Sequence, residues 1–248
     1  VTAHFEATDS LSGIQGASFF DVFFAEEGAD QSATRTFTDL AGNSTSATVS
    51  GINIDKTPPA ITGSQTPGPN PNGWNNTDVT VSFNCSDGLS GVESYSAPMT
   101  LTAEGAGQSS TGTAEDKAGN RATATVSGIN IDKTLPVISG LPAPGCSLWP
   151  PNHRLVQVAT VVASDGLSGM EAGSPVVTGT SNEPENGLGD GDLALDMIIM
   201  GGSVQLRSER SGTGTGRLYT LTATASDRAG NSATATATCT VPHDQGKK

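Results

Sequence analysis

The sequence TVSGINIDKT occurs twice, at Thr48–Thr57 and at Thr125–Thr134, and each copy runs into a proline-bearing apolar stretch. The two copies lie 125 − 48 = 77 residues apart. A repeat with this period is typical of tandem structural units. The chain of 248 residues is therefore predicted to hold three units, at 1–56, 57–133 and 134–248.

The composition favours an all-β fold. Aromatic residues make up 4% of the chain, and 31 glycines and 14 prolines interrupt runs rich in Thr and Val, a pattern typical of short strands and tight turns. The net charge of −13 argues against a nucleic-acid partner, because phosphate binding needs a basic surface. There is no apolar run of about 18 residues, so no membrane span is expected.

Two turn motifs recur in register. Asp-x-Leu-Ser-Gly begins at Asp9, Asp87 and Asp165, and Asp-x-Ala-Gly-Asn begins at Asp39, Asp116 and Asp227. An aspartate that accepts hydrogen bonds within its own turn, followed by a glycine, predicts a hairpin between the flanking Thr/Ala/Val runs. The runs after the second motif, 44–54, 121–131 and 232–241, are predicted closing strands.

The first unit lacks a segment that the second one has. Residues 58–78 precede the predicted strand 79–85, whereas its counterpart, 1–7, opens the chain. Alternation predicts that Val1 faces inward on this strand and that His4 faces outward to solvent. The first unit therefore lacks its opening strand, and its edge invites strand addition. Since no leader segment precedes it, we expect a piece of a longer polypeptide or a processed product.

The order Asp-x-Leu-Ser-Gly, Asp-x-Ala-Gly-Asn, Ile-Asp-Lys-Thr-x-Pro resembles the bacterial immunoglobulin-like (Big/HYR-like) domains of secreted and cell-surface proteins. The resemblance covers nearly the whole chain and implies two-sheet sandwiches of about seven strands each. It implies an extracellular or bacterial cell-surface location and no enzyme activity. The short, proline-bearing linkers favour an extended rod.

The third unit resembles a C-terminal variant of such domains, on the segments Cys146–His153 and Cys239–Gln245. In a secreted sandwich the two cysteines can lie side by side, so a Cys146–Cys239 disulfide is expected, closing a loop of about 90 residues. Two free thiols are the alternative. Cys85 is predicted to be a small buried apolar residue.

The third unit also carries an acidic insertion. Its two turn motifs lie 227 − 165 = 62 positions apart, against 116 − 87 = 29 in the second unit, which leaves 62 − 29 = 33 extra residues. The carboxylates in or beside the insertion are Glu183, Glu185, Asp190, Asp192 and Asp196. Because Ca²⁺ takes six to eight oxygen ligands, these residues form a candidate calcium site. A solvated loop with aspartate-capped turns is the alternative.

A second kind of cation site follows from the sandwich topology. Both turn motifs should lie at the end of the unit where the linker arrives, so that a linker aspartate approaches two turn aspartates. The predicted groups are Asp55 with Asp87 and Asp116, and Asp132 with Asp165 and Asp227. A bound cation would stiffen the junction. The alternative is that each aspartate only caps its own turn.

Catalytic signals are absent from the sequence. The histidines, His4, His153 and His243, have no Gly-x-Ser-x-Gly or His-Glu-x-x-His motif near them, and His153 is expected to pack within its loop. We therefore predict a non-catalytic extracellular structural protein: a stalk, spacer or filament subunit, stiffened by Ca²⁺ or completed by an added strand. Its partners would be other domains of a longer chain or neighbouring copies. The alternatives are an adhesive or carbohydrate-binding module contacting a surface glycan through the insertion, and an accessory region of a secreted hydrolase.

Overall fold

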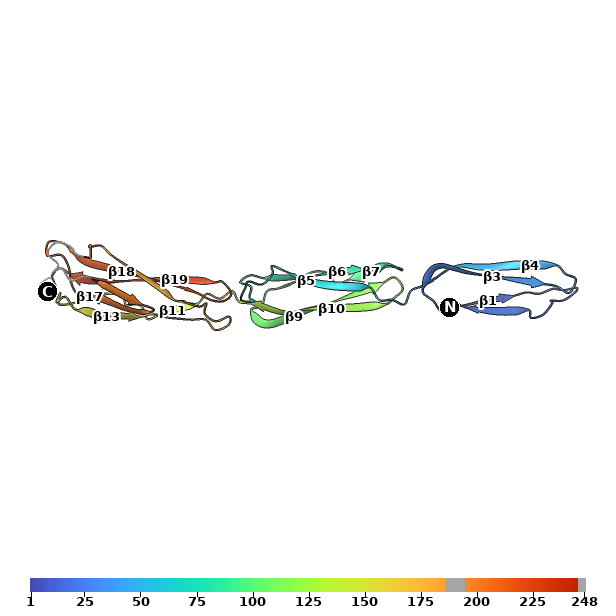
Figure 1. Cartoon of the computed structure of the whole chain (residues 1–248), viewed down its shortest axis with the longest axis horizontal. Coiled ribbons are helices and arrows are strands. Elements are labelled where there is room, and N and C mark those ends of the chain that lie inside the picture. Colours follow the sequence, from blue (N-terminus) through green and yellow to red (C-terminus); the bar gives the residue numbers. More distant parts are fainter. Residues whose placement is uncertain (186–194, 245–248) are drawn as a thin grey trace. The chain divides into compact units, whose positions relative to one another are not determined.

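The computed structural model describes residues 1–185 and 195–244 (Figure 1). Every regular element in these residues is a β-strand, which confirms the all-β prediction. No helix in them is long and apolar enough to cross a bilayer.

The strands follow the three repeats. The first repeat contains β1 (Thr2–Glu6), β2 (Phe19–Phe23), β3 (Gly28–Thr38) and β4 (Ser44–Ile54). The second contains β5 (Ala60–Thr66), β6 (Val79–Ser86), β7 (Val92–Tyr95), β8 (Met99–Leu101), β9 (Gly105–Asp116) and β10 (Arg121–Ile131). The third contains β11 (Val137–Ser139), β12 (Cys146–Ser147), β13 (Leu155–Thr160), β14 (Val162–Ser164), β15 (Val176–Ser181), β16 (Met197–Met200), β17 (Ser203–Arg207), β18 (Gly216–Ser226) and β19 (Ser232–Pro242).

Each repeat divides its strands between sheets. The first has the pairs β1-β2 and β3-β4, and the second has sheets in the orders β5-β6-β8 and β10-β9-β7. The third has β11-β14, β12-β19-β18-β15 and β13-β17-β16. The closing strands β4, β10 and β19 start at the predicted residues, directly after the Asp-x-Ala-Gly-Asn turns.

By contact density the chain separates into two compact units. One consists of Val1–Gln65, Thr80–Met99 and Ser109–Val126, and the other of Thr66–Val79, Thr100–Gln108 and Ser127–Lys248. The strands of the second repeat are thus shared between the two units. The predicted domain boundaries and the rod-like arrangement stay predictions.

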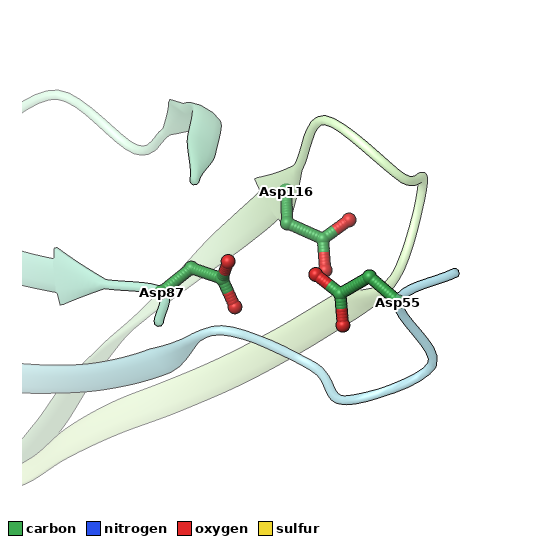
Figure 2. A group of neighbouring side chains, drawn as sticks. All are labelled: Asp55, Asp87 and Asp116. Atoms are coloured by element: carbon green, nitrogen blue, oxygen red, sulfur yellow. The ribbon is translucent and has the colours of Figure 1, made fainter. Parts of the chain in front are cut away.

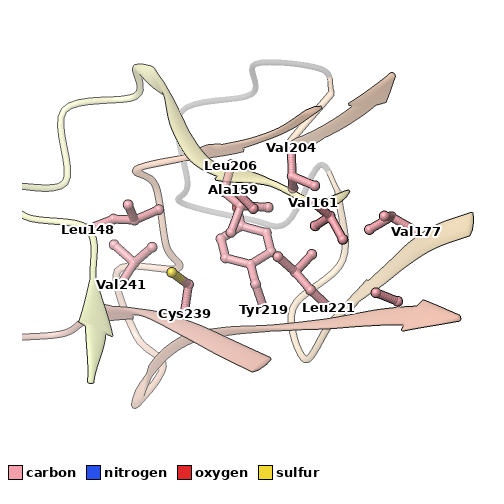
Figure 3. Close-up of a cluster of buried hydrophobic side chains, with 11 residues drawn as sticks. Leu148, Ala159, Val161, Val177, Val204, Leu206, Tyr219, Leu221, Cys239 and Val241 are labelled. Carbon is pink, nitrogen blue, oxygen red and sulfur yellow. The ribbon is translucent and has the colours of Figure 1, made fainter. Parts of the chain in front are cut away.

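Inward-facing alternate residues build the core of the third repeat. Along β18, Tyr219, Leu221 and Ala223 are fully buried. They pack with Leu206, Val204 and other apolar residues between the sheets (Figure 3). The first repeat has a smaller core centred on Ala3, Phe5 and Phe37, with partly buried apolar residues around them.

The segments that open the second and third repeats, residues 58–78 and 135–148, share one topology. Each first pairs with the strand that leads into the Asp-x-Leu-Ser-Gly turn, as β5 does with β6 and β11 with β14. Each then crosses over to run parallel to the closing strand. Asn75 bridges Ile131 in parallel, and β12 runs parallel to β19. We call these two stretches the opening segments.

The first repeat has no such segment among its described residues, where β1 pairs with β2 alone. Ala3 and Phe5 of β1 face inward as predicted, and Val1, which precedes β1, is 62% exposed.

Candidate cation sites at the linkers

The Asp-x-Leu-Ser-Gly turn is closed by its own aspartate. The Asp87 Oδ1 atom accepts hydrogen bonds from the backbone N–H of Leu89 at 3.1 Å and of Gly91 at 2.7 Å. Asp165 accepts the same pair, from Leu167 at 3.0 Å and Gly169 at 2.9 Å. The glycine in each turn has a positive φ, 81° at Gly91, which a residue with a side chain rarely adopts. The capping role expected from the sequence is therefore present.

The Asp-x-Ala-Gly-Asn turn adds an asparagine clamp. Asp116 accepts the backbone N–H of Asn120 at 2.8 Å on one oxygen and the Asn120 side-chain amide at 2.8 Å on the other. The same amide also donates to the carbonyl of linker residue Asp55, at 3.2 Å. In the third repeat, Asn231 donates to the Asp132 carbonyl at 2.9 Å. The asparagine therefore ties the turn to the incoming linker.

The linker aspartates point into these turns. The Asp55 carboxylate accepts the backbone N–H of Ser90 at 2.9 Å, and the Asp132 carboxylate accepts that of Ser168 at 2.9 Å. Both serines belong to the Asp-x-Leu-Ser-Gly turn. Each linker is thus held through its carboxylate by one turn and through its carbonyl by the other.

The result is two groups of three carboxylates, which we call the linker triads. In the first linker triad, oxygens of Asp55, Asp87 and Asp116 lie within 4.8 Å of one another (Figure 2). In the second linker triad the same holds for the carboxylates of Asp132, Asp165 and Asp227. The predicted approach of linker and turn aspartates is confirmed, and it coexists with turn capping.

Hydrogen bonds lower the pKa of two of these carboxylates, Asp55 in the first linker triad and Asp165 in the second. Hydrogen bonds from Ser90 hold the pKa of Asp55 below its usual value, against the opposing effect of burial. At Asp165, burial raises the pKa, but hydrogen bonds from Gly169, Leu167 and Ser168 outweigh it, and the pKa is lowered. Charged carboxylates this close repel one another, and a divalent cation would relieve that repulsion. Clustered carboxylate oxygens are the ligands that hard cations such as Ca²⁺ prefer.

The first repeat supplies an internal reference. Asp9 and Asp39 cap the same two turns, with hydrogen bonds to Gly13 at 2.7 Å and to Asn43 at 2.8 Å. No linker aspartate joins them among the described residues, and they form no triad there. In both triads found among the described residues, the third carboxylate therefore comes from the linker.

The acidic insertion is arranged differently from the expected calcium site. Glu183 and Asp196 both contact Arg217, with 3.2 Å between Glu183 Oε2 and Arg217 Nε. Glu185 is exposed, and Asp190 and Asp192 lie outside the described residues. A guanidinium thus supplies the positive charge that the hypothesis assigned to Ca²⁺ at Glu183 and Asp196. The full ligand set stays a prediction.

The sequence analysis missed this buried ionic cluster. Arg217 is 1% exposed, and its Nη1 atom also lies 3.3 Å from the Tyr219 hydroxyl. Burial opposes its charge, yet hydrogen bonds to Tyr219 and Asp196 raise the pKa of Arg217. Nearby, the fully buried Glu209 lies 3.0 Å from Nδ1 of His153. The missed signal was the position of Arg217, in phase with the inward-facing residues of β18.

The remaining sequence candidates fall in separate places. A disulfide joins Cys146 and Cys239, the expected pair, whose Cα atoms are 4.7 Å apart. Cys85 is half-buried rather than buried, because it lies near the end of β6 beside the turn. His4 is on the outward face as predicted, where its Nδ1 atom lies 2.6 Å from Asp21. His153 pairs with buried Glu209, which is more than the packing role expected of it.

Comparisons with known proteins identify no family. No protein-family model matches the chain, and no curated protein matches it. The Big/HYR-like resemblance therefore stays a prediction.

Several solved structures have a similar arrangement of strands. Protocadherin gamma B2 extracellular cadherin domains 1–5 match at 13% identity and a TM-score of 0.41, over 99% of this chain and 53% of theirs. Protocadherin gamma C5 EC1–3 matches at 11% identity and a TM-score of 0.42, over 87% of this chain and 78% of theirs. A bacterial ice-binding adhesin matches at 16% identity and a TM-score of 0.33, over 84% of this chain and 72% of its own. The chain spans about half the length of the protocadherin gamma B2 structure. Similarity at these TM-scores assigns no function.

Proposed function

We propose that this chain is a non-catalytic, extracellular structural segment, a stalk or spacer of tandem immunoglobulin-like sandwiches whose junctions bind Ca²⁺. The observation that carries the proposal is the linker triad, which occurs twice. Each copy has one aspartate from the linker and one from each of the two turns. A cation there would contact the linker and both turns of the following repeat at once. Binding would therefore limit bending at the linker and extend the chain.

Two further features support an extracellular structural role. The Cys146–Cys239 disulfide is of the kind that persists in oxidising compartments. The net charge of −13 suits divalent cations and argues against nucleic-acid binding. Bacterial origin and assembly into filaments belong to the same proposal and rest on the sequence resemblance alone.

Calcium titration followed by thermal melting tests the proposal. A cation that binds only the folded state stabilises it by about 2.7 kcal/mol at 100 times its Kd. We expect the melting temperature to rise with Ca²⁺ and to fall again with chelator. Asp116→Asn should remove the response at the first linker triad, and Asp227→Asn that at the second.

The first repeat supplies the control. Asp39→Asn removes the same turn cap where the described residues hold no triad, so its calcium response should match that of the unmodified chain. Melting that is unchanged by calcium, or an equal loss of response in Asp39→Asn, would refute the cation role.

A second candidate function rests on one cavity in the third repeat. The cavity has a volume of about 460 Å³ and is lined by Glu183, Asp196, Met197, Ile199 and Tyr219 among others. Its mix of carboxylates and apolar side chains would suit an adhesive or carbohydrate-binding module. A screen of glycans by NMR, with shifts confined to Met197 and Tyr219, would favour this role over the structural one.

A further inference from the structure

The strand β2 lies at the edge of its sheet and exposes large aromatic side chains. It pairs with β1 on one side, and no strand of the described residues pairs with its other side. Phe19 is 57% exposed, Phe20 42% and Phe23 73%. An exposed apolar edge strand is a template for pairing with another strand. β2 is therefore a candidate interaction surface.

The free edge of β2 lies on the side of the sheet away from an opening segment. In the second repeat β5 of the opening segment pairs with one side of β6, and β8 pairs with the opposite side. β8 and β2 are counterparts, because the Nζ atom of the linker lysine donates to the Ala25 carbonyl in the first repeat and to the Thr102 carbonyl in the second. This alignment equates Phe23 with Thr100, which is exposed although the second repeat holds its opening segment. The exposure of Phe23 is therefore independent of an opening segment.

A proline blocks the equivalent edge of the second repeat. The same alignment places Pro98 at the position of Asp21, and β8 has only three residues, Met99–Leu101. Proline has no N–H to donate, and prolines and short strands are two means by which sheet edges avoid pairing. β2 has five residues and no proline. The first repeat thus lacks both features that protect this edge in the second.

The backbone of β2 directs alternate residues toward the free edge. The Ser18 carbonyl, one residue ahead of β2, accepts the Ala7 N–H at 2.9 Å. The register of β2 on β1 then continues without a bulge. Because every second residue of an antiparallel pair bonds to its partner strand, the N–H and C=O groups of Phe19, Asp21 and Phe23 face the other way. These three residues therefore present the groups that a further strand would use.

The sequence of β2 is self-complementary under two-fold symmetry. An antiparallel pairing of two copies centred on Asp21 places Phe19 opposite Phe23 and Phe20 opposite Val22. The two strands would form about six backbone hydrogen bonds, since each facing pair exchanges both of its bonds. A two-fold interface uses the same surface on both subunits in this way.

We propose that the free edge of β2 is a docking surface for β2 of a second copy of this chain. The two copies would share a continuous sheet in the order β1-β2-β2-β1. With about 200 Å² for a phenylalanine, the exposed parts of the three aromatic residues amount to about 340 Å² per copy, against about 800 Å² per partner in a standard interface. We therefore expect a weak dimer that forms at high local concentration.

Charge limits this pairing. The two Asp21 carboxylates would face each other at the two-fold axis, and like charges directly opposite each other destabilise a strand pair. Each Asp21 also contacts its own copy, with 2.6 Å between its Oδ1 atom and Nδ1 of His4. The net charge of −13 adds a repulsion between copies that salt screens. Added salt and removal of the Asp21 charge should therefore both strengthen the dimer.

The test is sedimentation velocity of the full chain at concentrations up to about 1 mM. Chelator is present throughout, so that the outcome is independent of the proposed calcium sites. We expect a concentration-dependent dimer. Asp21→Asn should tighten it about twofold to fivefold, because it removes the facing charges. Phe23→Thr, which introduces the residue of the second repeat, should weaken it at least about tenfold, because each dimer loses two aromatic contacts.

Met200→Thr is the matched control. Met200 is 74% exposed and ends β16, which is the edge strand of a sheet in the third repeat. Its replacement removes a similar exposed apolar side chain from an edge that the proposal does not use. The dimer should therefore be unchanged. A loss equal to that of Phe23→Thr would show general hydrophobic association and would overturn the proposal.

Amide hydrogen exchange locates the contact. In the dimer, exchange should slow by about tenfold or more at Phe19, Asp21 and Phe23, whose N–H groups face the free edge. The amides of Phe20 and Val22 already face β1 and should change less. A chain that stays monomeric up to about 1 mM would refute the pairing, as would a dimer without this alternation.

Discussion

Asp55 and Asp132 occupy identical ten-residue sequences, yet Asp132 is fully buried and Asp55 is half-exposed. Both accept a serine N–H at 2.9 Å and both join two turn aspartates. What differs is the opening segment beside them. Residues 70–75 cover the second linker, whereas the first linker borders a cavity of about 530 Å³. Local sequence thus sets the geometry of a linker triad, and a separate segment sets its burial.

The largest expected effect comes from uncoupling the opening segment of the third repeat from its closing strand. Replacing Cys146 and Cys239 by serine removes the covalent tie between β12 and β19. We expect a loss of about 2–5 kcal/mol in the free energy of unfolding, measured by urea denaturation. Cys85→Ser is the control, since Cys85 is free, and an equally large loss there would contradict the assignment.

A matched pair of asparagine variants tests the same contrast with a smaller effect. Asn130→Ala removes the hydrogen bonds to Gly73 and to the Gly107 N–H, at 2.8 and 2.7 Å. Asn53→Ala removes the bond from the Asp30 N–H at 2.8 Å but no contact to an opening segment. We expect Asn130→Ala to cost about 1–3 kcal/mol and Asn53→Ala about 1 kcal/mol less, by denaturant unfolding. Equal costs would show that the segment is held by other contacts.

The smallest expected effect is on the pH dependence of stability. Hydrogen bonds from Gly13 and Leu11 lower the pKa of Asp9. In the third repeat, burial raises the pKa of Asp165, but the equivalent hydrogen bonds outweigh burial and the pKa is lowered. A lowered folded-state pKa adds stability that is complete above the unfolded value of about 3.9 and is lost as the pH falls through the folded-state pKa.

Melting scans between about pH 6 and pH 2 measure how much stability these lowered pKa values contribute. Asp9→Asn and Asp165→Asn should each flatten the decline of the melting temperature below about pH 4. An acid dependence identical to that of the unmodified chain would show that these turns do not titrate as proposed.

Much of the fold was readable from the sequence because its cues are local. Alternation predicted β1 and β6, and the Asp-x-Ala-Gly-Asn motif predicted the starts of β4, β10 and β19 to the residue. The linker triads were also predictable, since the topology places both turns at the end where the linker arrives. Arg217 was missed, although its phase with Tyr219 and Leu221 on β18 marks it as inward-facing.

The sequence by itself determined the repeats, the turns and the three aspartates of each linker triad, because each depends on residues within a few positions or on a fixed period. Tertiary structure alone decided which of these groups are covered. The parallel crossing of an opening segment onto a closing strand joins residues 131 − 75 = 56 positions apart, and no local pattern encodes it.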